Sequence, residues 1–220
     1  MILPILYSLQ HCPYAMRARL AILLAQQKVQ LRAITMKNKP AEMLEVSPKG
    51  TVPVLLLNEN ERNQKVIEES LDIMLWALNR NDPDNLLYSQ QDDALPEMLK
   101  IIEENDSQFK PKLEKYKRAK RFHNDDEEQC RLECEPFIQQ LEQRLAQHEY
   151  LMGAKPSLLD YALLPFVRQF SKVNRPLFLK GDYSHLQRWL SNHLQSRLFS
   201  KTMALYPLWL ESDEECILGE

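Results

Sequence analysis

The sequence predicts an α/β domain followed by an all-helical domain. Over the first 80 residues, short apolar runs typical of strands alternate with segments of helical spacing, in the order β-α-β-α-β-β-α. The polar, proline-interrupted stretch at 81–88 has the composition of a linker. Beyond it, apolar residues recur at helical spacing and no strand is predicted. We therefore expect a thioredoxin-like layer at 1–80, a linker at 81–88 and an all-helical domain at 89–220.

Each element of the first domain is predicted from its local pattern. The apolar run at 2–7 indicates a first strand. Met16, Leu20 and Leu24 fall on one face of a helix over 14–27. The other predicted elements are strands at 29–34, 52–57 and 65–67, helices at 40–46 and 70–79, and a polar hairpin loop at 58–64.

Helical periodicity defines the second domain, with helices predicted at 95–116, 127–147, 158–172 and 186–193. An acidic segment at 123–129 joins two of them. Ser157 and Asp160 have the spacing of a capping box, in which each side chain accepts a backbone N–H of the other residue. We interpret this pair as a stabilising device, and replacing Ser157 by Ala should cost about 1 kcal/mol.

Bulk composition excludes several classes of protein. The net charge of −3 is small and charges of both signs are interspersed, which argues against a nucleic-acid partner. No segment has the ~20 consecutive apolar residues that a membrane-spanning helix needs. The apolar N-terminal run has neither the basic flank nor the cleavage site of a signal peptide. We therefore expect a cytoplasmic protein that does not associate with membranes.

The four cysteines, at 12, 130, 134 and 216, form no CxxC pair. Without a secretory signal they do not indicate a disulfide framework, so free thiols are expected. Cys130 and Cys134 lie one helical turn apart, but no further ligands surround them. The sequence therefore predicts no metal site.

Cys12 is the residue most suited to carry chemistry. It follows the first strand and precedes a helix whose first turn accommodates Pro13. Its sulfur is expected to face the backbone N–H groups of Tyr14 and Ala15, which favours the reactive thiolate. Because position 15 is Ala15 and not a second cysteine, any redox cycle must be monothiol and must use an external thiol.

The helix alone is not enough to ionise this thiol. A thiolate that dominates at neutral pH requires roughly 2.7 kcal/mol of preference for the anion. A helix dipole supplies about 0.3–1 kcal/mol. N–H···S bonds, or a cation such as Arg17 or Lys39, must supply the remainder.

Five motifs in consistent order resemble the glutathione-transferase family, most closely its cysteine-type Omega class. They are Cys12-Pro13-Tyr14, Lys37-Asn38-Lys39-Pro40, Gly50-Thr51-Val52-Pro53-Val54-Leu55, Glu69-Ser70, and the capping box from Ser157 to Asp160 followed by Ala162-Leu163-Leu164-Pro165-Phe166. Together they extend over most of the chain. The resemblance implies the glutathione-transferase fold, glutathione as cosubstrate and a homodimer.

The resemblance also assigns roles to individual residues. The proline matching Pro53 is cis in this family, so the extended tripeptide can pair with the backbone of Val52. A helix start at Ser70 offers N–H groups to the γ-glutamyl carboxylate. Glu69 would bind the ammonium group, and Lys39 the glycyl carboxylate. The implied glutathione-binding residues are Tyr14, Lys39, Val52, Pro53, Glu69 and Ser70.

The predicted function is a glutathione-dependent thiol transferase or reductase with Cys12 as nucleophile. Disulfides, glutathionylated substrates and dehydroascorbate are the acceptors considered. One alternative is a conjugating transferase in which Tyr7 or Ser8 activates the glutathione sulfur. Another is a binding or regulatory protein of the same fold. The presence of Lys39, Val52-Pro53 and Glu69-Ser70 argues against it, because a protein that only binds partners could lose these residues.

Overall fold

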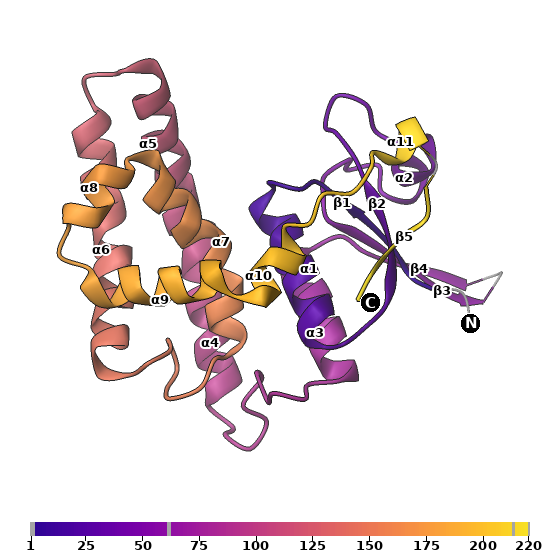
Figure 1. Cartoon of the computed structure of the whole chain (residues 1–220), viewed down its shortest axis with the longest axis horizontal. Coiled ribbons are helices and arrows are strands. Elements are labelled where there is room, and N and C mark those ends of the chain that lie inside the picture. Colours follow the sequence, from indigo (N-terminus) through magenta and orange to yellow (C-terminus); the bar gives the residue numbers. More distant parts are fainter. Residues whose placement is uncertain (1–2, 61–62, 213, 220) are drawn as a thin grey trace. The chain divides into compact units, whose positions relative to one another are not determined.

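A computed structural model describes residues 3–60, 63–212 and 214–219, and the chain divides into two compact units (Figure 1). The first unit comprises residues 1–84 and 196–220, and the second comprises residues 85–195. The predicted pairing of an α/β domain with a helical domain is confirmed. Residue 2 of the predicted first strand and residues 61–62 of the predicted hairpin loop lie outside the described residues.

The first unit contains a five-stranded sheet in the order β4-β3-β1-β2-β5. β1 pairs in parallel with β2, whereas the β1–β3, β3–β4 and β2–β5 pairs are antiparallel. At the centre of the sheet, Leu6 lies opposite Leu31 on one side and Leu55 on the other, and all three are buried. The strands are β1 (Ile5–Ser8), β2 (Val29–Ala33), β3 (Val54–Asn60), β4 (Asn63–Ile67) and β5 (Cys216–Leu218).

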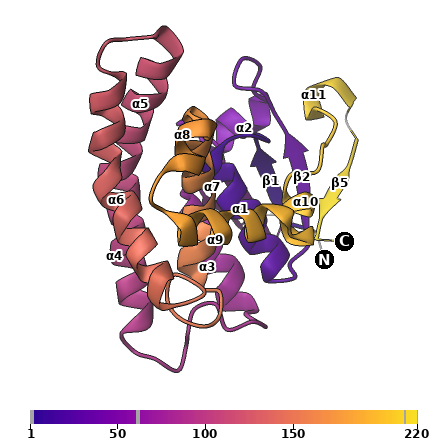
Figure 2. The same ribbon diagram turned by 60° about the vertical axis from the view of Figure 1, so that its left-hand side comes forward.

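Three helices complete the βαβαββα layer. They are α1 (Pro13–Leu24), α2 (Ala41–Val46) and α3 (Ser70–Arg80). α1 packs against α3, and the two lie side by side against the sheet (Figures 1 and 2). Most of α1 is buried, as expected for a helix that is apolar around most of its circumference. It ends at Leu24, short of the predicted residue 27, because Gln26 has a left-handed backbone with φ 53°.

The hairpin strands are longer than predicted. β3 continues to Asn60 and β4 begins at Asn63, within the segment predicted to be a loop at 58–64. Asn, Glu and Gln side chains have low strand propensity, so composition alone predicts a loop here. Pairing between the two strands overrides that preference, with a register shift between Asn58 and Asn60.

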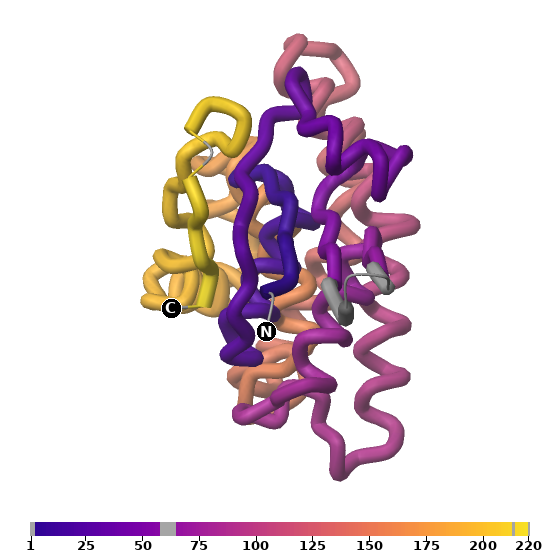
Figure 3. The backbone as a smooth tube through the Cα atoms, turned by 90° about the vertical axis from the view of Figure 1, so that its right-hand side faces the viewer, coloured from indigo at the N-terminus to yellow at the C-terminus, as the bar shows by residue number. Residues whose placement is uncertain are grey.

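The C-terminal segment differs most from the prediction. Residues 196–220 group with the α/β unit, although the sequence analysis placed them in an all-helical domain. This segment forms α10 (Arg197–Thr202), α11 (Trp209–Ser212) and β5. β5 pairs with β2 at the edge of the sheet, where Figure 3 shows the two running side by side. A three-residue strand has too few positions for a recognisable alternation, so its pairing partner cannot be read from local sequence.

The second unit is helical, as predicted. Its helices are α4 (Ala94–Glu104), the π-helical turn η1 (Asn105–Phe109), α5 (Lys110–Phe122), α6 (Glu127–Gln147), α7 (Leu158–Val173), α8 (Arg175–Lys180) and α9 (Ser184–Gln195). The predicted helix at 95–116 thus extends to Phe122 and is interrupted by η1. Pro111 has no N–H to donate, and widening of the preceding turn accommodates the missing bond.

Aromatic rings form much of the core of the helical unit. Phe109 stacks on Phe137, with ring centres 4.7 Å apart, and Phe170 lies between Phe109 and Phe178 with both centres 6.2 Å away. Such ring pairs are among the larger contributions to core packing. Phe170 is therefore a core residue in this unit.

The capping box between Ser157 and Asp160 is present at the start of α7. The Ser157 N–H donates to Asp160 Oδ2 at 2.8 Å. The other carboxylate oxygen accepts from the Leu151 N–H at 3.0 Å and from Trp189 Nε1 at 2.8 Å. Burial raises the pKa of Asp160, and these hydrogen bonds oppose that effect. The motif therefore joins three segments of the helical unit in addition to capping α7.

Candidate functional site

Cys12 lies immediately before α1, at its N-cap position, with extended backbone angles of φ −70° and ψ 124°. Pro13 is the first residue of the helix, as predicted. The Cys12 N–H donates to the Leu9 carbonyl at 3.2 Å, which closes the turn between β1 and α1. The thiol is partly buried and donates to the Val52 carbonyl oxygen at 3.7 Å.

The expected contact between the Cys12 sulfur and the N–H groups of Tyr14 and Ala15 is not formed, because the side chain makes no cap hydrogen bond. A thiol is a weak donor and a weak acceptor. Here the Cys12 thiol donates to the Val52 carbonyl oxygen. The prediction about the position of Cys12 holds, but the prediction about its hydrogen-bond partner is wrong.

The loop before β3 lies beside the thiol. The Val52–Pro53 peptide bond is cis, as the resemblance implied. Val52 belongs to a buried cluster that includes Tyr7 of β1 and Met43 of α2, and Cys12 packs against this cluster. The β1–α1 turn, the loop before β3 and α2 therefore meet around Cys12.

Glu69 and Ser70 form the start of α3. Glu69 is the N-cap residue, with φ −94° and ψ 132°, and Ser70 is the first helical residue and is buried. The Glu69 carboxylate, 66% exposed, is paired with the ammonium group of Lys49. Lys49 was not identified from the sequence, because nothing in the local pattern separates it from an ordinary loop lysine.

Lys39 lies between β2 and α2 and is partly buried. Its ammonium group is close to the backbone of Gly50, where an added Cβ would lie 3.1 Å from Lys39 Nζ. Gly50 also has φ +62°, so a side chain there would be strained as well as crowded. Tyr14 is the second residue of α1, and the guanidinium carbon of Arg17 lies 5.6 Å from the centre of its ring.

Arg19 holds the turn that precedes Cys12. Its buried guanidinium donates to the Ser8 hydroxyl at 2.5 Å, to the Gln10 carbonyl at 2.6 Å and to the Thr202 carbonyl at 2.9 Å. Burial lowers the pKa of Arg19 to about 10, and interaction with Cys12 opposes that effect. The side chain is therefore charged at neutral pH, and it holds the turn through these bonds.

Arg19 was not identified from the sequence, from which Arg17 and Lys39 were expected as cations near the thiol. The available signal is that the helix after Cys12 contains two arginines, Arg17 and Arg19, among mostly apolar residues. The partners of Arg19 are backbone carbonyls and a hydroxyl group, and these partners are visible only in the fold.

The hydroxyl groups of Tyr7 and Ser8, the alternative activators, are both held by arginine side chains. Tyr7 is buried and its hydroxyl accepts from Arg32 Nη1 at 2.9 Å. Burial raises the pKa of Tyr7, opposed by Arg32. The Ser8 hydroxyl is the acceptor for Arg19. Both hydroxyl groups are therefore buried acceptors of arginine N–H groups, and each retains its own O–H to donate.

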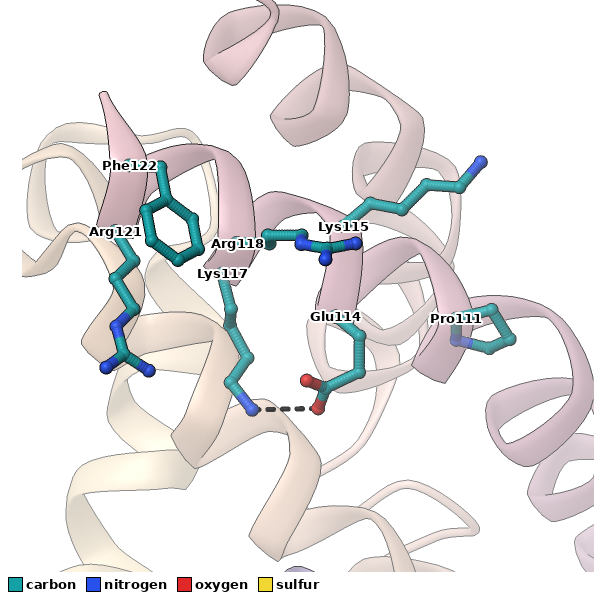
Figure 4. A pocket seen from close by; sticks show the side chains of 7 residues that line it. All are labelled: Pro111, Glu114, Lys115, Lys117, Arg118, Arg121 and Phe122. Atoms are coloured by element: carbon teal, nitrogen blue, oxygen red, sulfur yellow. Dashed lines mark hydrogen bonds and ion pairs between the residues drawn. The ribbon is translucent and has the colours of Figure 1, made fainter. Parts of the chain in front are cut away.

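Two hollows in the described structure differ in their relation to Cys12. A cavity of about 160 Å³ in the α/β unit is bounded by the turn at residues 8–11, the end of β2 and the C-terminal segment at 204–208. A groove of about 550 Å³ lies along α5 in the helical unit, where Glu114 pairs with Lys117 (Figure 4). Its lining contains none of the predicted site residues, whereas the smaller cavity adjoins the Cys12 turn.

Within the described ranges, no group of three or more His, Cys, Asp or Glu residues is arranged to hold a metal ion. No described helix combines the length and the apolar character that crossing a membrane requires.

Comparison with known proteins matches both units. The glutathione S-transferase N-terminal domain model matches residues 6–85, and the C-terminal domain model matches residues 127–192. The chain belongs to the glutathione S-transferase family. The two matches together include well over half of the transferase chain, and they fall in the order that the sequence motifs predicted.

Curated relatives of this transferase support an Omega-like character. It is 26% identical to glutathione S-transferase omega-1 of Mus musculus over 227 residues, which cover 97% of this chain and 89% of that protein. It is 28% identical to omega-1 of Sus scrofa, with 76% and 67% covered, and 27% identical to glutathione S-transferase L3 of Arabidopsis thaliana, with 90% and 80% covered.

Solved structures confirm the fold of the transferase. A Pseudomonas putida glutathione transferase with one glutathione disulfide bound per subunit has a TM-score of 0.79 at 17% identity, covering 93% of this chain and 92% of that chain. A Pseudomonas fluorescens family member with two glutathione molecules bound scores 0.78 at 17% identity, with 91% and 92% covered. Omega 2C from Trametes versicolor scores 0.76 at 19% identity, with 92% and 93% covered.

Proposed function

We propose that the protein is a glutathione-dependent thiol transferase or reductase in which Cys12 is the nucleophile. The observation that carries this proposal is the position of the Cys12 thiol, at the N-cap of α1 and 3.7 Å from the carbonyl oxygen that precedes cis-Pro53. A cysteine between a first strand and a helix start is placed as reactive thiols are. The guanidinium of Arg19 holds the turn that carries this thiol.

Glutathione is the proposed cosubstrate, as the family and the glutathione-bound neighbours suggest. The backbone of Val52 would pair with the extended tripeptide. The start of α3 at Ser70 would bind the γ-glutamyl carboxylate through its N–H groups. Lys39 would bind the glycyl carboxylate, and Glu69, now paired with Lys49, would exchange that partner for the glutathione ammonium group.

The proposed cycle uses one protein thiol. The Cys12 thiolate attacks the glutathionyl sulfur of a mixed disulfide, forms a Cys12–glutathione disulfide and releases the substrate thiolate, which takes up a proton. The thiolate of a second glutathione then attacks the glutathionyl sulfur, yielding glutathione disulfide and regenerating the Cys12 thiolate. The net reaction converts the mixed disulfide and one free glutathione into the substrate thiol and glutathione disulfide.

Conjugation of glutathione to electrophiles is the less supported alternative. It requires a hydroxyl group that donates to the glutathione sulfur, and the Tyr7 and Ser8 side chains are both buried. The partly buried Cys12 thiol is instead suited to exchange with a disulfide that contains glutathione.

The proposal extends to the cellular location and the oligomeric state of the protein. We infer a cytoplasmic protein, because all four cysteines are free, as thiols are in a reducing compartment. A homodimer is inferred from the family, and size-exclusion chromatography with light scattering would test it.

Turnover of a small disulfide tests the proposed activity. Glutathione-dependent reduction of β-hydroxyethyl disulfide should be lost in Cys12→Ala and in Cys12→Ser, while both variants still bind glutathione. Cys216→Ser is the matched control, because Cys216 is a second partly buried thiol in the same unit, and it should keep full activity. Activity that survives without Cys12 would rule out the thiol as nucleophile and return attention to Tyr7 and Ser8.

A further inference from the structure

α2 is a short element whose position depends on side-chain contacts. It has six residues, and a helix of this length is not stable on its own. Met43 is its one buried residue, and it packs in the cluster beside Cys12. Lys39 directly precedes Pro40, the N-cap residue of α2. The placement of α2 therefore sets the placement of Lys39.

Trp209, at the start of α11, is bound to the exposed side of α2. Its Nε1 donates to Glu42 Oε1 at 2.7 Å, across 167 positions of sequence. The guanidinium carbon of Arg32 lies 4.0 Å from the centre of the Trp209 ring, within the range of a cation–π contact. Arg32 Nη1 also donates to Glu42 Oε1, at 3.3 Å, and to the Tyr7 hydroxyl at 2.9 Å. The indole thus joins α2 to β2, and through Arg32 it is also linked to Tyr7 of β1.

The segment that carries Trp209 is itself fixed to the sheet. Leu208 forms an isolated parallel bridge with Ala33 at the end of β2. Beyond α11, β5 pairs with β2, with Leu218 opposite Val29. Trp209 is therefore anchored on both sides along the chain, and it provides α2 with a fixed attachment point.

We propose that Trp209 is a positioning residue for glutathione binding, which holds α2, and with it Lys39, in the geometry that accepts the glycyl carboxylate. This inference rests on the proposed function. Trp209 touches neither the thiol nor the proposed positions of the γ-glutamyl end, so its effect is confined to the glycyl end of the tripeptide. Binding should depend on Trp209 when the ligand has that carboxylate and should be independent of Trp209 when it does not.

The test compares two unreactive ligands by isothermal titration calorimetry: S-methylglutathione and S-methyl-γ-glutamylcysteine, which lacks the glycine. Trp209→Phe keeps an aromatic ring over Arg32 and removes the N–H donor, and Glu42→Gln replaces the charged acceptor by a neutral, weaker one. Each should weaken S-methylglutathione binding roughly three- to tenfold, the range of one net hydrogen bond. Neither should change binding of S-methyl-γ-glutamylcysteine by more than about twofold.

Trp76→Phe is the matched control. Trp76 lies on α3 of the same unit, and its indole N–H has no hydrogen-bond partner among the described atoms. This variant should bind both ligands as the wild type does. The rate at which iodoacetamide alkylates Cys12 should also change by less than about twofold in Trp209→Phe, because Met43, and not Trp209, is the residue packed in the cluster beside Cys12.

The outcomes separate the two proposals. If the wild type binds neither ligand, the proposed glutathione function fails, and this inference fails with it. If the wild type binds S-methylglutathione and Trp209→Phe and Glu42→Gln bind it equally well, the inference alone is overturned. It is also overturned if both ligands lose affinity together or if alkylation slows, since either result indicates a general structural effect.

Discussion

At the scale of single residues, the environment of Cys12 combines a helix start with a buried cation. The thiol makes no bond to the helix N–H groups and donates to the Val52 carbonyl instead. The buried guanidinium of Arg19 bonds the Ser8 hydroxyl and the Gln10 carbonyl, so one side chain of α1 orders the turn that carries Cys12.

Replacing Arg19 tests its role in holding this turn. Arg19→Met removes the donors to Ser8, Gln10 and Thr202, so glutathione-dependent reduction of β-hydroxyethyl disulfide should fall roughly tenfold. Arg19→Lys keeps a donor but cannot reproduce the three-way contact, so its rate should lie between those of Arg19→Met and the wild type. The measurement is the turnover rate at a fixed pH.

Lys37→Met removes an exposed lysine of the same unit and serves as the control, with no change in rate expected. Circular dichroism checks that each variant is folded. An unchanged rate in folded Arg19→Met would show that the bonds of Arg19 do not position the turn for the reaction.

At the scale of elements, long amphipathic helices and the capping box were predictable because their signals are local. The box at Ser157 and Asp160 depends on residues three positions apart, and the structure contains it. Its further bonds to Leu151 and Trp189 join distant segments, and no pattern in the sequence indicates them. The π-helical turn before Pro111 was missed because the helical spacing of apolar residues continues through it, and no local pattern marks the widened turn.

His193 in α9 makes the stability of the helical unit depend on pH. The ring is buried among Trp189, Tyr161 and Tyr150, and burial lowers its pKa to about 4 from the usual 6.5. The unfolded chain takes up a proton below pH 6.5, whereas the folded state does so only near pH 4. The stability that His193 contributes is therefore present above the unfolded pKa and is lost as the pH falls through this window.

The free energy of unfolding should fall by about 3 kcal/mol between the unfolded-state pKa and the folded-state pKa of His193. Urea unfolding at several pH values measures it, and His193→Gln should flatten the dependence over that window. If the free energy of unfolding depends on pH equally in His193→Gln and in the wild type, other groups account for the pH dependence. His185→Gln is a useful comparison, because His185 is more exposed and bonds Glu142 on α6.

At the scale of the whole molecule, the chain's two ends meet in one unit. The C-terminal segment returns to the α/β unit after the helical unit, adds β5 to the sheet, and bonds Arg19 of α1 through Thr202 and Glu42 of α2 through Trp209. The sequence predicted the order of domains from composition and periodicity. It could not predict this return, because the contacts join residues more than 160 positions apart and the strand that completes it has three residues.

The covalent intermediate gives the most direct test of the central claim. Wild-type protein incubated with glutathione disulfide, quenched with acid and examined by intact-mass spectrometry and peptide mapping should carry one glutathionyl group, on Cys12, which excess glutathione removes. Cys12→Ser should carry none at that position. A wild-type protein that acquires no adduct at Cys12, or acquires it mainly at Cys216, would contradict the monothiol mechanism.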